Sequence, residues 1–330
     1  MFPDPEKSIS CEYNALIAVI VVNYNAGSML LRCLETIRSQ TIRPKQVIVV
    51  DNASQDGSIL AAETRFPEFD FIKLEKNIGF AAANNLAIHR TDGCYWIALL
   101  NPDAFAAPDW LERMLHASVS YPEYHFFGAR MLMDDDHTKL DGVGDIYHAV
   151  GLPWRMGHGK TAAGQFVNPM EIFSPCAAAA LYRRDDLIMI GGFDEDFFCY
   201  VEDVDVGFRL RLMGLRCLYV PDAIVFHKGS ALTGRRSNFA VYHGQRNLIW
   251  TFLKNVPAPW VWLLSPFHLL LNLVAVPLLG LPALRAKRDA LIGLGNIWRK
   301  RHVIQRTRCI GFRNLVPVMK FSLSSLMCRD

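Results

Sequence analysis

The sequence lacks any C-x-x-C pair, although eight cysteines are spread along its 330 residues. Without paired spacing, the cysteines indicate neither a zinc site nor a disulfide framework. Reduced thiols of this kind fit a cytosolic compartment best. Residues 1–14 are polar and acidic, and they contain no apolar run that resembles a secretory signal. We therefore expect the folded body to lie on the cytosolic side of a membrane.

The composition also lacks the extremes of disordered or collagen-like chains, with 51% hydrophobic and 20% charged residues. The net charge is only +3, but residues 283–330 hold 11 Lys and Arg against Asp289 and Asp330, a net of +9. The first 282 residues therefore hold 24 Lys and Arg against 30 Asp and Glu, a net of −6. An acidic body with a basic tail favours an anionic membrane surface as partner and no nucleic acid; a solvated basic face is the alternative.

Strand and helix patterns alternate through the first half of the chain. Continuous apolar runs predict buried strands, and helical patterns fall between them, one capped by Ser28 and another opened by Pro108. The strands are expected at 17–22, 46–50, 69–74 and 95–100, and a helix at 81–90. Repeated units of this spacing predict a doubly wound, mostly parallel α/β sheet. Residues 126–173 are less regular, and their glycines favour a long loop on the acceptor side.

Polar, small and acidic residues follow each of the four predicted strands. They are Asn23-Tyr24-Asn25, the run 51–58 (DNASQDGS), Asn77 with Gly79, and Asn101-Pro102-Asp103. Ligands of such sheets bind beyond the carboxyl ends of the strands, so four polar ends in register indicate one shared cleft. The alternative is that Asn, Asp, Gly and Ser are simply turn formers.

Four residues have the chemistry that a group-transfer site would need. Asp103, at a strand end, suits a hard cation, and His227 follows a predicted strand and can supply an imidazole ligand. Glu202 and Asp203 open a predicted helix, where the helix dipole keeps carboxylates ionised. Each residue has a simpler explanation: Asp103 as a cap, Glu202 and Asp203 as ordinary helix-start residues, and His227 as an interior histidine.

Five segments together resemble family 2 glycosyltransferases of the GT-A fold, in particular the rhamnosyltransferase-like branch that builds bacterial surface polysaccharides. They are residues 19–58, 77–85 (NIGFAAANN), 99–104 (LLNPDA), 191–214 (GGFDEDFFCYVEDVDVGFRLRLMG) and 225–230 (VFHKGS). The resemblance implies a Rossmann-like GT-A domain with a mostly parallel central sheet. It also implies inverting transfer of a sugar, rhamnose by this likeness, from a nucleotide-sugar donor to an acceptor hydroxyl.

The resemblance also implies roles for individual residues. Tyr24 and Asn25 would line the nucleotide pocket, and Asp51 would accept a hydrogen bond from a pyrimidine imide. Asp203 would be the catalytic base with Glu202 beside it, and Asp103 and His227 would lie at a Mg²⁺ or Mn²⁺ ion. The remaining expected donor-binding residues are Asn77, Gly79, Asn85 and Asn101.

Two departures from the family pattern stand out. The D-x-D metal motif reads Asn101-Pro102-Asp103, so one carboxylate is missing, and Pro175-Cys176 stands where a glycine often precedes the alanines of 177–180. Two other functions remain open. A sugar-1-phosphate nucleotidyltransferase would need a Gly-rich basic loop near the first strand, where residues 23–25 provide none. A catalytically silent sugar-nucleotide-binding or scaffold module would have no reason to keep Glu202 and Asp203.

Residues 255–284 carry no Asp, Glu, Lys or Arg. This uncharged stretch is long enough for a membrane span. Five prolines interrupt the stretch, and a single crossing would place the basic tail outside, against the positive-inside tendency. We therefore expect an interfacial arrangement on the cytoplasmic face of the inner (plasma) membrane; a buried helix pair is the alternative. The expected division is an N-terminal tail (1–15), a GT-A domain (16–254) and a helical membrane-surface module (255–330), with a lipid-linked or glycan acceptor.

Overall fold

The structure is a computed structural model that describes residues 17–229 and 237–322, so the expected tail at 1–15 lies outside the described residues. Its central feature is a mixed sheet in the order β10-β12-β6-β11-β4-β1-β2-β3, with β5 on β12 and β7 on β6. The strands are β1 (Ile17–Asn23), β2 (Gln46–Asp51), β3 (Asp70–Lys73), β4 (Trp96–Leu100), β5 (Ala104–Ala106), β6 (Phe126–Met133), β7 (Leu140–Gly142), β10 (Met170–Glu171), β11 (Ala179–Arg183) and β12 (Cys217–His227).

Strands β3, β2, β1 and β4 run parallel, while β11 is antiparallel to both of its neighbours. The sheet separates two layers of apolar side chains. Along β1, Ile17, Val19 and Val21 join one core, and Ala18, Ile20 and Val22 join the other. This alternation follows from the two-residue period of a strand, and burial on both faces explains the uninterrupted apolar run. The expected mostly parallel α/β sheet is confirmed.

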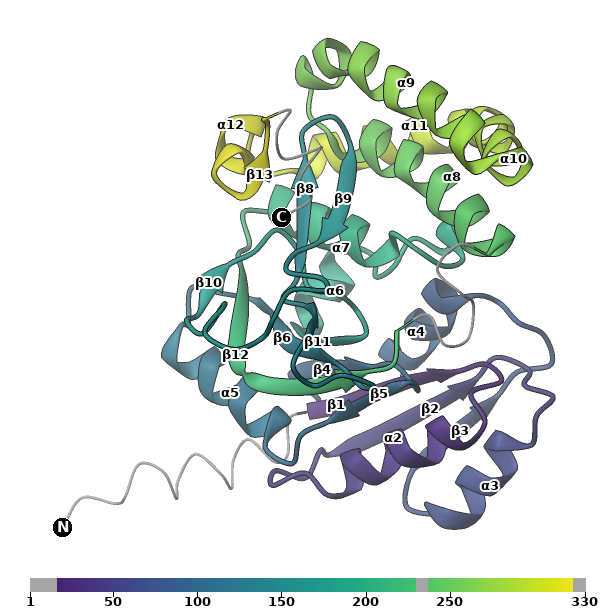
Figure 1. Cartoon of the computed structure of the whole chain (residues 1–330), viewed down its shortest axis with the longest axis vertical. Helices are drawn as coiled ribbons and strands as arrows, with labels where there is room; N and C mark the ends of the chain where they lie inside the picture. Colours follow the sequence, from purple (N-terminus) through teal and green to yellow (C-terminus); the bar gives the residue numbers. More distant parts are fainter. Residues whose placement is uncertain (1–16, 230–236, 323–330) are drawn as a thin grey trace.

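Helices cover both faces of the sheet. The first core receives side chains from α2 (Ser28–Arg38), α3 (Ser58–Arg65) and α5 (Trp110–Ser120). The second core receives them from α4 (Phe80–Ile88), α6 (Arg184–Met189) and α7 (Glu202–Leu212). This three-layer arrangement places the loops after β1, β2 and β4 at one edge of the sheet (Figure 1).

Two local expectations are corrected by the structure. Ser28 is the first residue of α2 and not its cap, because the chain turns at Gly27, whose N–H donates to Asp56 Oδ2 at 2.7 Å. Residues 126–173 form β6 and several shorter strands joined by turns, and not the expected long loop. Pro221 lies at a register shift inside the continuous strand β12, a position that proline tolerates.

Two of those short strands form a hairpin that belongs to a second sheet. The hairpin consists of β8 (Asp145–His148) and β9 (Leu152–Arg155), and β13 (Met319–Lys320) joins it alongside β8. The end of the described chain therefore returns to a hairpin from the middle of the sequence. The hairpin tip contacts the last helices, since His268 Nδ1 lies 2.7 Å from the carbonyl oxygen of Val150.

The carboxyl-terminal helices gather at one end of the molecule, and α2 and α3 lie at the other (Figure 1). They are α8 (Asn238–Asn255), α9 (Trp260–Leu279), α10 (Leu281–Ile292), α11 (Leu294–Thr307) and the short α12 (Phe312–Leu315). The prolines were expected to interrupt this region, but α9 is continuous. Pro266 and Pro277 both lie inside this 20-residue helix. Helix α8, at the expected division near residue 254, packs against α7 on one side and against α10 and α11 on the other.

Candidate active site

A hydrogen-bonded cluster joins the ends of β1 and β2. Asn23 and Asp51 are register partners in the parallel pair. The Asn23 side-chain amide donates to Asp51 Oδ1 at 2.7 Å and to the hydroxyl oxygens of Ser54 and Ser58. The N–H of Ser54 donates to Asp51 Oδ2. Asp51 is thus fixed at the strand end, and each of its oxygens still has a lone pair for a further donor.

The next two residues after β1 extend this cluster toward solvent. The backbone N–H of Asn25 donates to the Ser54 hydroxyl, and Asn25 Oδ1 accepts from the N–H of Gln55. Asn25 has a φ of 51°, which asparagine tolerates better than most residues. The Tyr24 side chain is 45% exposed, so its ring is available to a planar ligand beside Asp51.

The turn before α4 connects the second strand end to the segment that precedes α7. Asn52 donates to the carbonyl of Gly79 and accepts from the N–H of Ile78, while Asn77 Oδ1 accepts from the N–H of Gly79. Gly79 has a φ of 87°, and a Cβ there would lie 2.6 Å from the ring of Phe198. Glycine is therefore required for this close approach.

Asn85 lies away from the strand-end cluster. Its Oδ1 accepts from the N–H of Phe193, and its Nδ2 donates to the Phe193 carbonyl and to Glu195 Oε1. These contacts join α4 to the segment that follows α6. Asn101 directly follows β4, and its backbone accepts from Ala104 and donates to Ala178.

A buried chain of charged groups starts at Asp103. Its Oδ1 lies 3.5 Å from His227 Nε2, and His227 Nδ1 lies 2.7 Å from Asp141 Oδ2. Burial lowers the pKa of His227, but hydrogen bonds and charges from Asp103 and Asp141 outweigh burial and raise the pKa to about 9. Asp141 therefore orients the imidazole so that Nε2 faces Asp103.

Arg155 connects this chain to the helix that carries Asp203. From the end of β9, it donates to Asp141 Oδ2 at 2.6 Å and to Cys176 Sγ at 2.7 Å. The next residue, Ala177, donates its backbone N–H to Asp203 Oδ2 at 3.1 Å. Cys176, which departs from the family pattern, is thus the acceptor that fixes the second guanidinium nitrogen.

Three carboxylates in the first turn of α7 have different surroundings. Asp203 is half-buried, whereas Glu202 is buried, and burial together with the neighbouring Asp203 charge raises the pKa of Glu202 well above its usual value. Asp205 is fully buried and paired with Arg209 at 2.8 Å and Lys254 at 2.8 Å. Of the three, Asp203 has the carboxylate best placed to meet a substrate.

The set of metal ligands within the protein is small. Among residues 17–229 and 237–322, no group of three or more His, Cys, Asp or Glu side chains could hold a metal ion. Asp103 and His227 nevertheless offer one oxygen and one nitrogen, and the Asp141 contact to Nδ1 is the arrangement that metal-binding histidines usually have. These two atoms fit part of a Mg²⁺ or Mn²⁺ shell, with the rest left to phosphate oxygens and water.

Asp141, Arg155 and Asp145 were missed by the sequence analysis. Asp145, the first residue of β8, is buried; burial first, and then the Asp203 charge, raise its pKa to about 8. All three lie in residues 126–173, where strands of three or four residues are too short to show a period. The sequence feature that could have indicated Asp141 and Asp145 is the occurrence of isolated charges between apolar residues, as in LDGVGDIYH (140–148).

A mixed α/β sheet whose polar side chains gather beyond the carboxyl ends of its parallel strands is typical of α/β enzymes that bind a ligand at that edge. Residues 18–191 match the pattern of Glycosyl transferase family 2. The chain is also 30% identical over 251 residues to the N-acetylglucosaminyl-diphospho-decaprenol L-rhamnosyltransferase of Mycobacterium tuberculosis, covering 69% of this chain and 81% of that protein. The chain belongs to glycosyltransferase family 2.

Solved structures share the fold at low sequence identity. The crystal structure of GalNAc-T7 with UDP, GalNAc and Mn²⁺ aligns with a TM-score of 0.60 at 13% identity, covering 74% of this chain and 49% of that chain. The mannosyltransferase PcManGT from Pyrobaculum calidifontis, in complex with GDP-Man and Mn²⁺, aligns with a TM-score of 0.53 at 18% identity, covering 88% and 84%. These likenesses show the GT-A fold of this glycosyltransferase.

We expect the metal-free chain to lose stability between about pH 6 and about pH 9.5 because of His227. A histidine whose pKa is raised to about 9 stabilises the fold fully below its unfolded pKa, and this stabilisation disappears as pH rises through 9. The loss should be about 3 kcal/mol. Urea denaturation at both pH values, with chelator present, should show a flatter pH dependence in His227→Gln; equal pH dependence in both proteins would contradict the assignment.

Proposed function

We propose that the chain is an inverting glycosyltransferase in which Asp203 is the catalytic base. The observation that supports this most is the position of Asp203: it is the partly exposed carboxylate of the α7 start. The Ala177 N–H holds it in a chain of contacts that leads through Cys176 and Arg155 to Asp141 and His227. A base and a leaving-group site on the same sheet edge are what a single displacement requires.

In the proposed reaction, the acceptor oxygen attacks the anomeric carbon from the face opposite the leaving diphosphate. The bond from that carbon to the diphosphate oxygen breaks, and its electron pair leaves with the nucleotide diphosphate. Asp203 takes the proton of the acceptor hydroxyl. Glu202 and Asp205 are less suited to this role, because Glu202 holds a proton to higher pH and Asp205 is occupied by two cations.

The nucleotide of the donor is proposed to bind at the ends of β1 and β2. Asp51 would accept from the pyrimidine imide N–H, Tyr24 would contact the base, and Asn25 would line the pocket. The contact network supports this, because Asn23, Ser54 and Ser58 hold this turn in one conformation. Asn77, Gly79 and Asn101 lie in the neighbouring turns and complete the proposed donor side.

A divalent cation, Mg²⁺ or Mn²⁺, is proposed to be held by Asp103 and His227. Such an ion neutralises the charge that develops on a departing diphosphate. The two structural relatives named above were solved with Mn²⁺. In this chain, Asp141 and Arg155 keep the two proposed ligand residues oriented.

Rhamnose carried on a nucleotide diphosphate is the proposed donor, and a lipid-linked glycan is the proposed acceptor. Both proposals are based on the relative in Mycobacterium tuberculosis, an N-acetylglucosaminyl-diphospho-decaprenol L-rhamnosyltransferase. The chain aligns with 81% of that relative, so the likeness includes more than the nucleotide-binding half.

Helix α9 is the proposed membrane contact. It is long and apolar enough to cross a membrane, and only 11% of its most apolar 18-residue stretch is buried within the protein. One side of it is fixed to the protein, since His268 contacts Val150 and stacks on Phe252. The other side exposes Trp262, Leu263, Phe267, Leu270, Leu273 and Leu278. This favours a helix that lies in the interface, on the cytoplasmic face of the plasma membrane.

The basic tail supports this placement only in part. Lys300 pairs with Asp194 and Asp196, and Arg301 donates to the carbonyls of Leu253 and Val256. These two cations therefore face inward, contrary to the expectation for the whole tail. Exposed basic residues remain available for anionic headgroups: Arg285, Arg288, Arg299, Arg306, Arg313 and Lys320.

Asp203→Asn should lower kcat for transfer by about 10²–10⁴-fold, because the amide cannot accept the acceptor proton. Donor affinity should change little, since a base acts mainly in the transition state. Transfer from dTDP-rhamnose and nucleotide binding by calorimetry measure the two effects. Asp185→Asn, at an exposed carboxylate of α6, is the control. A variant with more than about a tenth of wild-type turnover would exclude Asp203 as the base.

Asp103→Ala should weaken donor binding and remove stimulation by Mn²⁺, because it deletes one of the two proposed protein ligands. Turnover and donor binding should be measured across a Mn²⁺ titration, with Asp109→Ala, at the exposed start of α5, as the control. Full Mn²⁺ stimulation of Asp103→Ala would remove this residue from the metal shell. Wild-type turnover in excess chelator would exclude the metal itself.

Leu270→Glu with Leu273→Glu should weaken binding to anionic vesicles, because charges on the exposed side of α9 oppose insertion among lipid tails. Both side chains are well exposed, so the fold should tolerate the change. Leu60→Glu, on the exposed face of α3, is the matched control. Vesicle co-sedimentation measures binding at low and high salt. Equal binding by the double variant and the control would remove α9 from the membrane contact.

A further inference from the structure

The segment immediately before the proposed base has an unusual backbone. Phe198, Tyr200 and Val201 have φ values of 63°, 70° and 67°. A β-branched residue such as Val201 rarely adopts a left-handed φ, and several such residues together persist only where surrounding contacts impose them. Helix α7 begins with the next residue, Glu202. The contacts that impose this backbone conformation therefore also set the orientation of the first turn of α7, which carries Asp203.

Helix α8 supplies contacts to this segment from behind. The Asn247 side-chain amide donates to the carbonyl oxygens of Phe197, Cys199 and Tyr200, at 2.9, 3.0 and 2.8 Å. Asn247 is fully buried. One side-chain amide therefore satisfies backbone carbonyls on both sides of Phe198. Because Asn247 is buried, removing its amide would leave these carbonyls without their hydrogen-bond donor.

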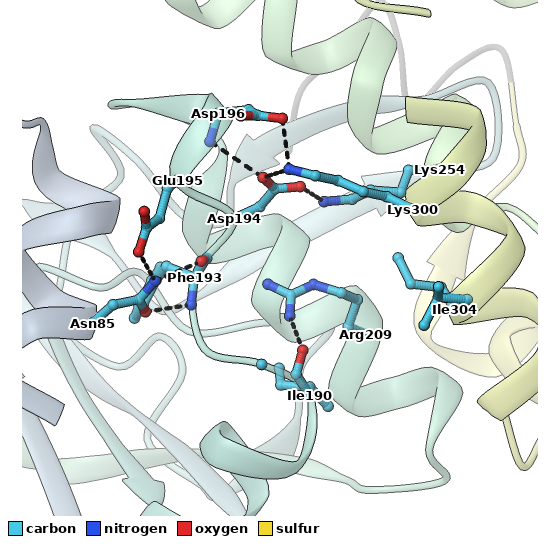
Figure 2. Close-up of a pocket in the computed structure, with 12 residues that line it drawn as sticks. Asn85, Ile190, Phe193, Asp194, Glu195, Asp196, Arg209, Lys254, Lys300 and Ile304 are labelled. Atoms are coloured by element: carbon cyan, nitrogen blue, oxygen red, sulfur yellow. Dashed lines mark hydrogen bonds and ion pairs between the residues drawn. The ribbon is translucent and has the colours of Figure 1, made fainter. Parts of the chain in front are cut away.

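The neighbouring residues of α8 strengthen the same attachment. Arg246 donates to the carbonyls of Asp196 and Phe197. Lys254, only 1% exposed, pairs with Asp194 before the segment and with Asp205 after it. Figure 2 shows Lys254 and Lys300 reaching Asp194 together. Residues 194–205 are thus held at both ends and in the middle by one helix.

We propose that Asn247 is a positioning residue for the sugar-transfer reaction: its amide holds residues 197–200 in the conformation that aims Asp203 at the acceptor hydroxyl. The inference rests on the proposed role of Asp203 as base. Asn247 itself touches neither substrate nor metal in this scheme. Its neutral amide makes it a purely geometric device, unlike Lys254, whose removal would also change the electrostatic field at Asp203.

Asn247→Leu tests this inference, because leucine has a similar size and removes every donor. We expect kcat for transfer from dTDP-rhamnose to fall by about 10- to 100-fold, the effect of a displacement on the order of 1 Å at a reacting group. The dissociation constant for dTDP or UDP should stay within about twofold, since the strand-end cluster is untouched. Calorimetric stoichiometry gives the concentration of folded protein to which kcat is normalised.

Gln305→Met is the matched control. The Gln305 side-chain amide on α11 also donates to two backbone carbonyls, those of Lys254 and Asn255, but at the far end of α8. We expect this variant to lose thermal stability to a similar extent while keeping its kcat. The inference is overturned if Asn247→Leu lowers kcat no more than Gln305→Met does. It is also overturned if Asn247→Leu raises the nucleotide dissociation constant by as large a factor as it lowers kcat.

Two further variants separate this inference from the proposed base. Asn247→Ser keeps one hydrogen-bond donor, so its kcat should fall less than that of Asn247→Leu. If the leucine variant does not fold, the kcat of Asn247→Ser relative to wild type tests the inference in its place. Adding Asn247→Leu to Asp203→Asn should cause no further loss, because the two residues act as one unit. If Asp203→Asn keeps its turnover, both the base and the inference fall. If Asp203→Asn loses turnover by the expected factor and the two losses multiply in the double variant, only the inference falls.

Discussion

The site depends on one constraint, which is that charges withdrawn from water at the sheet edge must neutralise one another. Asp103, His227, Asp141 and Arg155 alternate in sign along a continuous series of contacts. Removing one partner from such a series leaves a buried charge uncompensated, which typically costs about 3–5 kcal/mol. The series draws its members from β7, β9, β12 and the loop after β4. Charge neutralisation therefore joins elements that are far apart in the sequence and that strand pairing brings to one edge of the sheet.

The meeting of the ends of β1 and β2, where the donor is proposed to bind, could be predicted from the sequence because its signals are local. Asn23 and Asp51 end long apolar strands, and a parallel sheet must bring such ends to one edge. The charge network could not be predicted in the same way. Asp141 and Arg155 are near in sequence, but Asp141 meets His227 only through pairing of β6 with β7 and β12. Those registers depend on tertiary packing and not on periodicity.

The carboxyl-terminal quarter shows the same limit of composition. Prolines in residues 255–284 favoured an interrupted arrangement, yet α9 is continuous. Each proline inside α9 removes one hydrogen bond within the helix, at the carbonyls of Trp262 and Leu273, yet the helix continues through both positions. Likewise, charge counting treats Lys300 and Arg301 as part of a basic surface, whereas the acidic segment 194–196 and the open end of α8 bind them internally.

The two halves of the site are consequently built by different means. The proposed donor side consists of four adjacent turns at the ends of one sheet, within residues 18–191, to which the family pattern extends. The proposed base lies beyond that range, on α7, and is held by α8 and, through Asp194, by Lys300 of α11. Helix α11 packs beside the exposed apolar helix α9, with the Trp262 and Trp298 rings stacked at 5.7 Å. A chain of direct contacts therefore runs from the proposed membrane face to the residue that would activate the acceptor, and none of it passes through the nucleotide side.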